Sequence, residues 1–178
     1  AGSEVKATHT KAILAAAKLT LHSNINWVIV GDGRKLNWIR SEVKNNNLSN
    51  VYLWGRYPVE AMPSMFKRAD VMLVSLKDKE VFSLTVPAKI QAYMASGKMI
   101  VSMLNGVGRD VINESKCGLS CSAGNSVELV NAVITLSKST VNDKMQMQQN
   151  AKKYYEHHFS KKMLFDKLES ILNELVNI

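Results

Sequence analysis

The sequence lacks several features that would assign it to a special class of protein. Its two cysteines, Cys117 and Cys121, are too few for a disulfide framework, which favours a reducing interior compartment. The longest apolar run, 12–17, has six residues, whereas a membrane span needs about 20 and the apolar part of a signal peptide about 7–15. There is no low-complexity tract, and basic residues never run longer than two. We therefore expect a folded, soluble chain without a dedicated nucleic-acid arm.

What the chain does contain fits one globular domain with acidic partners. Of its 178 residues, 46% are apolar and 21% are charged, which suits one core of the size that about 100–200 residues build. Lys and Arg number 23 against 15 Asp and Glu, so the net charge is +8. This balance favours phosphates, nucleotides, nucleic acid or anionic lipid head groups without choosing among them.

Short apolar, β-branched runs alternate with longer segments of helical period, which is typical of βαβ units around a parallel sheet. The five predicted strands are 27–30, 51–54, 71–76, 99–103 and 118–121. The first, third and fourth barely alternate between apolar and polar residues, so we expect both of their faces to be covered. The predicted fold class is α/β, with a Rossmann-like parallel sheet of five or six strands and helices on both faces.

The predicted helices have recognisable ends. Gly97 ends one helix, and Asn125 with Glu128 resembles a capping box for another. Helical sequence already begins within a few residues of Ala1, although an α/β domain usually opens with a strand, so we expect a single-domain fragment (1–178) of a larger protein or a cloning remnant at residues 1–3. Ser160 is expected to cap a last helix, whose apolar stripe is Leu164, Leu168, Ile171 and Leu175.

In an open parallel sheet, ligands bind beyond the carboxyl ends of the strands, so the loops that follow the strands form the candidate site. Gly31-Asp32-Gly33-Arg34 can bring backbone N–H groups close to a phosphate, or it simply connects a strand to a helix. It is not a dinucleotide fingerprint, because Leu36 replaces the third glycine.

A phosphate-binding loop of the Walker type is absent too. Gly97-Lys98 could end such a motif, but Ala92 stands where its first glycine is required. The second loop, Gly55-Arg56-Tyr57, lacks the acid with which NAD sites bind ribose.

The third loop, 77–86, leads into Thr85-Val86-Pro87-Ala88-Lys89 at the start of a helix. Exposed N–H groups, the positive end of the helix dipole and a lysine within one turn can hold a diphosphate. The alternative is a capped helix with a solvated lysine. Glu80, in the same loop, is either a contact for a sugar hydroxyl or a solvated side chain.

Patterns for metal binding are weak. Cys117 and Cys121 lie across a predicted strand with no histidine beside them, so we expect buried free thiols. His157 and His158 are adjacent, so on a helix they point in different directions and cannot chelate a metal together. The sequence contains no Asp-x-Asp motif. We expect no metal site.

Four segments, in this order and spacing, resemble glycosyltransferase family 4. They are WVIVGDG at 27–33, NVYLWG at 50–55, ADVMLV at 69–74 and KIQAYMASGK at 89–98. The similarity is to the carboxyl-terminal, donor-binding domain of that family and covers essentially the whole chain. Segment 82–91 is most similar to bacterial enzymes of O-antigen, capsule or colanic-acid synthesis, such as N-acetyl-L-fucosamine transferases. The resemblance implies a GT-B fold, two Rossmann-like domains facing a cleft, of which only the second is present.

The resemblance also implies roles by position. Its candidates for nucleotide binding are Gly31, Gly33, Arg56, Tyr57, Thr85, Val86 and Lys89. Gly31 and Gly33 would lie against the cleft near the donor, and Arg56 and Tyr57 would lie where the nucleotide base packs. Thr85, Val86 and Lys89 would meet the diphosphate. Lys89 and Glu80 are the catalytic candidates, because they would meet the leaving group and the transferred sugar.

The sequence departs from the family pattern at two places. The family has two glutamates eight positions apart, but Ala88 lies eight positions after Glu80. The glutamate that binds ribose is replaced by Ala92. In the family, basic residues that bind the diphosphate usually follow the first strand. Here that strand is missing or vestigial, and Lys6 and Lys11 are only loose counterparts of those residues.

The activity implied is transfer of a sugar from a UDP-linked donor, with retention at the anomeric carbon and without a metal. The acceptor would be lipid-linked or a polysaccharide, bound by the absent amino-terminal domain, so this half should bind nucleotide without turning over. Two alternatives stay open: a UDP-sugar 2-epimerase of the same fold, and a non-catalytic basic module for nucleic acid or an anionic membrane. The charge fits a cytoplasmic protein held at the inner membrane surface.

Overall fold

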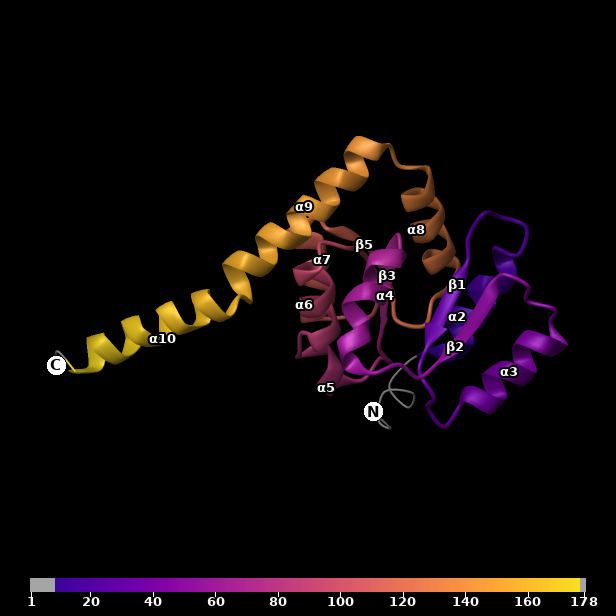
Figure 1. Ribbon diagram of the computed structural model, residues 1–178, viewed down its shortest axis with the longest axis horizontal. Coiled ribbons are helices and arrows are strands. Elements are labelled where there is room, and N and C mark those ends of the chain that lie inside the picture. The colour runs from indigo at the N-terminus through magenta and orange to yellow at the C-terminus, as the bar shows by residue number, and fades with distance from the viewer. Residues whose placement is uncertain (1–8, 177–178) are drawn as a thin grey trace.

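A computed structural model describes residues 9–176, in which parallel strands alternate with helices (Figure 1). The strands are β1 (Trp27–Val30), β2 (Val51–Gly55), β3 (Val71–Ser75), β4 (Met99–Met103) and β5 (Gly118–Cys121). The helices are α2 (Thr10–Leu19), α3 (Leu36–Asn45), η1 (Val59–Ala61), α4 (Met62–Arg68), α5 (Glu80–Ser83), α6 (Ala88–Ala95), α7 (Val107–Ser115), α8 (Ser126–Lys138), α9 (Val141–His158) and α10 (Lys161–Val176). The predicted strands are confirmed to within one residue at each end. Residues 1–3 and Lys6 lie outside the described residues.

Every strand pair is parallel, which confirms the α/β class. The pairs are β1 with β2, β3 with β4, and β4 with β5. Between residues 9 and 176, hydrogen bonds therefore join the strands in two groups, β1-β2 and β3-β4-β5, rather than in one continuous sheet. The apolar pattern of a strand locates the strand but does not name its neighbour, so this division was not predicted.

β4 lies at the centre of the core. All five of its residues are buried. Val101 and Met103 join the apolar cluster that contains the inner faces of α2 and α8, whereas Ile100 joins the cluster that contains α6, α7 and Ala151 of α9. Because side chains alternate along a strand, β4 is covered by helices on both faces, as predicted.

β1 is less buried than its apolar sequence suggests. Trp27 and Ile29 pack into the core, but Val28 is 45% exposed and Val30 is 40% exposed. The prediction that both faces of this strand are covered is therefore wrong, because the described residues cover only one of them. β3 is intermediate, with its first three residues half-buried and its last two buried.

The start of α8 confirms the predicted cap but not the full capping box. Asn125 Oδ1 accepts the backbone N–H groups of Val127 and Glu128, each at 3.1 Å. The Glu128 carboxylate accepts the side-chain amide of Asn125 at 2.8 Å and the backbone N–H of Ser122 at 2.7 Å, rather than the backbone N–H of Asn125. Glu128 therefore joins the helix start to the loop after β5. Ser160 caps α10 as predicted, since its Oγ accepts the N–H of Met163 at 3.2 Å.

The two cysteines are buried and free, as predicted. Burial raises the pKa of both thiols, that of Cys121 to about 11. Because the thiolate is the reactive form, both side chains are inert packing groups at neutral pH.

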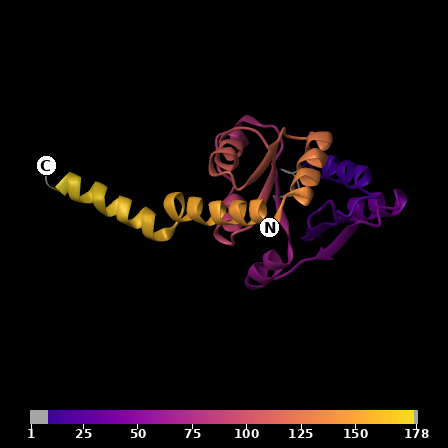
Figure 2. The ribbon, with the colours of Figure 1, turned by 90° about the horizontal axis from the view of Figure 1, so that it is seen from above.

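The carboxyl-terminal helices leave the body of the domain. α9 packs across α6, and α10 continues from its end and projects outward (Figures 1 and 2). Among the described residues, no helix is both long enough and apolar enough to cross a membrane.

Gly118 provides a test of the β4–β5 pairing. A methyl group on Gly118 would collide with the carbonyl oxygen of Ile100 on β4. Because this oxygen belongs to a paired strand and cannot move away cheaply, we expect Gly118→Ala to lower the free energy of unfolding by about 3 kcal/mol. The matched control is Ser120→Ala, which removes the hydrogen bond from Ser102 at 3.0 Å and should cost about 1 kcal/mol. Urea unfolding measures both, and equal losses would contradict the packing described.

Glu128 should make stability depend on acidic pH. Hydrogen bonds from Ser122, with smaller effects of Arg109 and Asn125, hold the pKa of its carboxyl below the ordinary 4.5. The folded state thus favours the charged form, so its stabilisation is complete at neutral pH and is lost as pH falls below 4.5 through the lower folded pKa. We expect Glu128→Gln to lower the melting temperature at pH 7, with a difference from wild type that shrinks below pH 4.5. The exposed Glu169→Gln is the control, and a gap that is constant with pH would refute this assignment.

Candidate functional site

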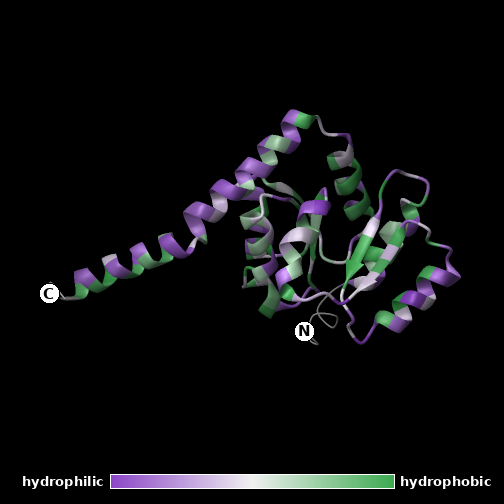
Figure 3. Cartoon of the chain, in the orientation of Figure 1, coloured by the Kyte–Doolittle hydropathy of each residue, from purple (hydrophilic) through white to green (hydrophobic). Residues whose placement is uncertain are grey.

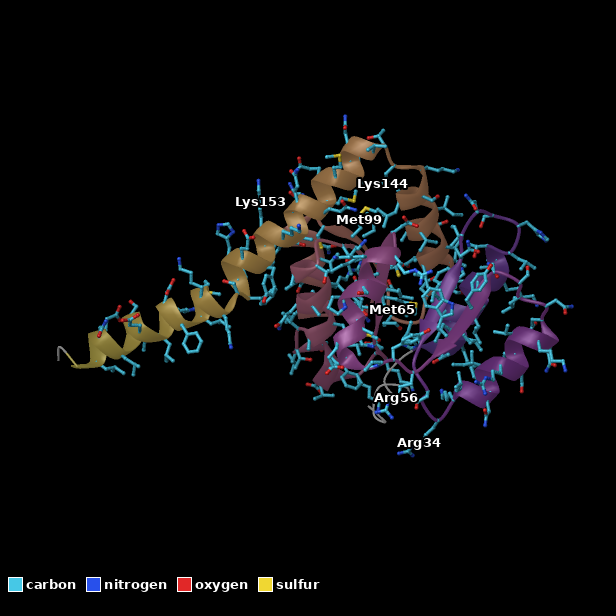
Figure 4. The ribbon with its side chains drawn as sticks, viewed as in Figure 1. Arg34, Arg56, Met65, Met99, Lys144 and Lys153 are labelled. Atoms are coloured by element: carbon cyan, nitrogen blue, oxygen red, sulfur yellow. The ribbon has the colours of Figure 1, made fainter. Side chains whose placement is uncertain are left out.

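The parallel direction of the strands places the loops that follow them at one edge of the domain, where open parallel sheets bind ligands. In Figure 4, Arg34 after β1 and Arg56 after β2 lie at this edge, whereas Lys144 and Lys153 on α9 lie at the far end. The candidate residues at this edge form two groups.

The loops after β1 and β2 form the first group. The Gly31 N–H donates to the Gly55 carbonyl at 2.6 Å, and Arg56 Nη1 lies 3.9 Å from Asp32 Oδ2. Both charged side chains are exposed, so this ion pair is weak. The structure therefore brings together the predicted residues Gly31 and Arg56, and Tyr57 beside them is 42% exposed.

The glycines of this group are needed for their backbone shape. Gly31 has φ +139° and Gly55 has φ +73°, conformations that L side chains rarely adopt, and no atom lies within 4 Å of the place of a Cβ at either residue. The backbone there faces open space, which leaves room for a ligand. Gly33 follows, half-buried, and its carbonyl accepts the N–H of Leu36 at 2.8 Å.

The second group is formed by the starts of α6 and α7. A Cβ on Gly106 would collide with the Ser83 carbonyl, and one on Gly108 would lie 3.0 Å from Pro87 Cδ. The first turn of α7 therefore lies directly against the first turn of α6. Each helix start presents unpaired N–H groups and about half a positive charge. Two such ends at one place favour an anion.

Two cations lie in these first turns. Lys89 lies in the first turn of α6, as predicted, and is exposed, as is Thr85, whereas Val86 is half-buried. Arg109 is half-buried on α7 and close enough to Glu128 to lower the pKa of that carboxyl. Glu80 is exposed, but it starts the short helix α5 rather than lying in an open loop. The prediction of one long loop over 77–86 is wrong at that point.

Arg109 was not among the sequence candidates, although a signal for it exists. Gly106-Val107-Gly108-Arg109 follows β4 in the same pattern as Gly31-Asp32-Gly33-Arg34 follows β1. Both segments are glycine turns from a strand toward a helix, each with an arginine. The repeated pattern is therefore a sequence signal that could have added the loop after β4 to the candidate residues.

His9 was also missed, and it connects α2 to this edge. Its backbone N–H donates to Ser75 Oγ at the end of β3 at 3.2 Å. Its ring lies over Gly124 after β5, where a Cβ would come within 3.0 Å of the ring. Burial, reinforced by Lys77, lowers the pKa of His9, so the ring is neutral at pH 7. Lys11, in the first turn of α2, is exposed.

A shallow groove at the other edge of the domain is a weaker candidate for a ligand site. It has a volume of about 240 Å³ and is lined by the end of α7 and by α9, including Glu114, Asn150 and Lys153. Tyr154 donates to the Glu114 carboxylate at 3.0 Å, and the Asn150 side-chain amide donates to the Lys116 carbonyl at 3.1 Å, so these groups already bond to one another or to the backbone. In the part of the chain that the structure describes, no three His, Cys, Asp or Glu residues are arranged to hold a metal ion.

The chain is similar to known glycosyltransferases in sequence and in fold. The probable glycosyltransferase WbjE of Pseudomonas aeruginosa is 25% identical over 124 residues, which cover 68% of this chain and 30% of that protein. HepE from Anabaena, solved with UDP and glucose, matches 92% of this chain and 44% of its own with a TM-score of 0.75 at 16% identity. The C-terminal domain of the group 1 enzyme LpcC from Francisella tularensis matches 88% of this chain and 82% of its own, with a TM-score of 0.71 at 17% identity.

The chain thus spans 30% of the length of WbjE and 44% of that of HepE. Its fold is that of one domain of the GT-B glycosyltransferases, as the sequence resemblance implied. Residues 4–154 match the family described as "Glycosyl transferases group 1". With this match over most of its length, the chain belongs to the group 1 glycosyltransferases.

Proposed function

We propose that this chain is the donor-binding domain of a retaining glycosyltransferase that uses a UDP-linked sugar. The observation that carries the proposal is the meeting of the first turns of α6 and α7, with Lys89 and Arg109, at the carboxyl edge of the strands. A diphosphate there would accept backbone N–H groups and two charge-assisted hydrogen bonds.

The same groups would serve catalysis. When the sugar leaves, the diphosphate gains negative charge, and donors already in place stabilise this charge without reorganising. Lys89 is proposed to meet the leaving group, with Thr85 and Val86 offering backbone contacts before α6. Glu80 is proposed to stand near the transferred sugar. We propose no metal for this step, since the cations are those of the chain itself.

The nucleoside end is proposed to lie at the first group of loops. Gly31 and Gly33 offer backbone beside open space, and Arg56 and Tyr57 offer an exposed flat guanidinium and ring on which a base can stack. Because Ala92 is exposed and carries no hydrogen-bonding group, ribose must be recognised by other residues than in relatives with a glutamate there.

The acceptor is proposed to be lipid-linked or a polysaccharide, as in bacterial surface polysaccharide synthesis, and to bind a separate domain across the cleft. The shares of WbjE and HepE that the chain spans are consistent with this division. We propose a cytoplasmic protein at the inner face of the membrane, where the net charge of +8 favours anionic lipids. Nucleic acid is not a proposed partner.

Nucleotide binding tests the proposal directly. Calorimetric titration should show binding of UDP in preference to ADP and GDP, and Lys89→Ala or Arg109→Ala should weaken it about tenfold each, because each removes a charged contact to phosphate. Lys153→Ala, far from this edge (Figure 4), is the matched control.

Failure of UDP to bind the folded chain would contradict the proposal, as would unchanged affinity in both variants. Binding without nucleotide preference that collapses between low and moderate salt would instead favour a basic module for nucleic acid or membranes.

The isolated chain should bind the donor without transferring its sugar. Half of the proposed cleft, including the acceptor side, lies outside these residues, so the reactants cannot be brought together. Incubation with radiolabelled UDP-glucose or UDP-N-acetylglucosamine and candidate lipid acceptors should release no more UDP than a blank. Conversion of a UDP-sugar to its C2 epimer by the chain would support the epimerase alternative.

A further inference from the structure

His9 carries a ring nitrogen that the fold leaves without a partner. Its Nε2 is buried and makes no hydrogen bond to any of the described residues. Within the described part of the chain, Asn50 Oδ1 is in the same state, but it lies in the interior, where the Asn50 amide donates to the Ala17 carbonyl. A buried polar atom without a partner costs free energy, which a ligand can return by supplying the partner. Of the two residues, His9 is the one that lies at the edge where ligands bind.

Helix capping does not explain the side chain of His9. The residue directly precedes α2, yet its side chain makes no capping hydrogen bond to that helix. The link to β3 uses the backbone of His9, whose N–H donates to Ser75 Oγ at 3.2 Å. The residue is half-buried, and its ring stands over the backbone of Gly124. The imidazole is therefore available for a role outside the fold itself.

The position of His9 connects it to the cations of the candidate site. Ser75 ends β3 and Gly124 follows β5, and β4 lies between these two strands. Arg109, on the helix after β4, is close enough to Cys121 and Glu128 to lower the pKa of each. His9 and Arg109 thus approach the same loop after β5. They do so from helices that cover opposite faces of β4.

Two charged groups of the loop after β3 act on the ring. Burial is the largest cause of the lowered pKa of His9; Lys77 lowers it further, and Asp78 raises it. Gly124 brings no charge to the ring, and α8, which packs against α2, is largely hydrophobic (Figure 3). Charges near the ring are therefore weakly screened. The Lys77 ammonium has no hydrogen-bond or ion-pair partner among the described residues.

We propose that the ring of His9 binds the diphosphate of the donor and takes up a proton when it does so. The inference rests on the proposed function, which places the diphosphate at the starts of α6 and α7. A diphosphate at the end of β4 would have Lys89 and Arg109 on one side, and His9 with Lys77 on the other. Protonation gives the ring a second N–H, and phosphate oxygens are the acceptors that this N–H needs.

The sign of the pH dependence follows from the two states of His9. In the free chain its pKa lies below the ordinary 6.5, so the ring is neutral at pH 7. The negative charges of a bound diphosphate favour the protonated ring and raise that pKa. Binding then takes up a proton at pH values between the two pKa values, and affinity increases as the pH falls through this interval.

Titration calorimetry with UDP-glucose over about pH 5–8 tests the proposal. UDP-glucose is the suitable probe, because it lacks the terminal phosphate of UDP, which itself titrates near a pH of about 6. Binding should tighten about tenfold toward the acid end. The heat of binding should vary with the ionisation enthalpy of the buffer, which reports the proton taken up.

His9→Gln should bind as the wild type does at the alkaline end and should lose the gain at the acid end. His22→Gln, at an exposed position in the turn after α2, is the matched control and should keep the gain. Circular dichroism checks that both variants are folded. NMR of the wild type gives a second measurement, in which saturation with UDP-glucose should raise the pKa of His9.

Three results would overturn the proposal and leave UDP-sugar binding intact. They are an acid gain that survives in His9→Gln, a pKa of His9 that UDP-glucose does not raise, and equally weakened binding of His9→Gln at every pH. The last pattern would indicate a structural role for the side chain. Failure of the folded wild type to bind UDP-glucose at any pH would instead remove the proposed function together with this inference.

Discussion

The burial of β4 on both faces is the constraint on which the rest of the structure depends. A strand with no exposed residue must be covered on both faces, and here helices from the crossover connections between parallel strands supply both layers. Parallel strands with helical crossovers place every strand end, and the start of the helix that follows it, at the same edge. The positive ends of the helix dipoles therefore gather there as a result of the topology.

The topology brings the helix starts to one edge, and the glycines bring two of them together. Gly106 and Gly108 have no side chain at the points where α7 meets Ser83 and Pro87. A larger residue at either place would push α7 away from α6 and separate Arg109 from Lys89. The electrostatic character of this edge thus depends on missing side chains as much as on the cations.

Much of the fold could be predicted from the sequence, and the reasons differ by element. β4 was located correctly because five consecutive residues are suited to a buried strand, whereas the exposure of Val28 and Val30 depends on which elements lie nearby, which the four residues of β1 do not encode. Lys89 was placed at a helix start by local signals alone, namely Pro87 before it and Gly97 after it. Arg109 was missed because its nearness to α6 arises from a contact between segments about 20 residues apart, and no periodicity within either segment reports that contact.

The packing of α9 has a consequence for how the chain matures on the ribosome. Ala151, Tyr154, Tyr155 and Phe159 complete the apolar cluster around Ile90 and Met94, which lie some sixty residues earlier in the chain. Synthesis runs from the amino terminus, so this side of α6 stays uncovered until α9 has emerged from the exit tunnel. During that interval the nascent chain exposes an apolar surface of the kind that chaperones bind, and a chain that ends before α9 lacks the side chains that complete this core cluster.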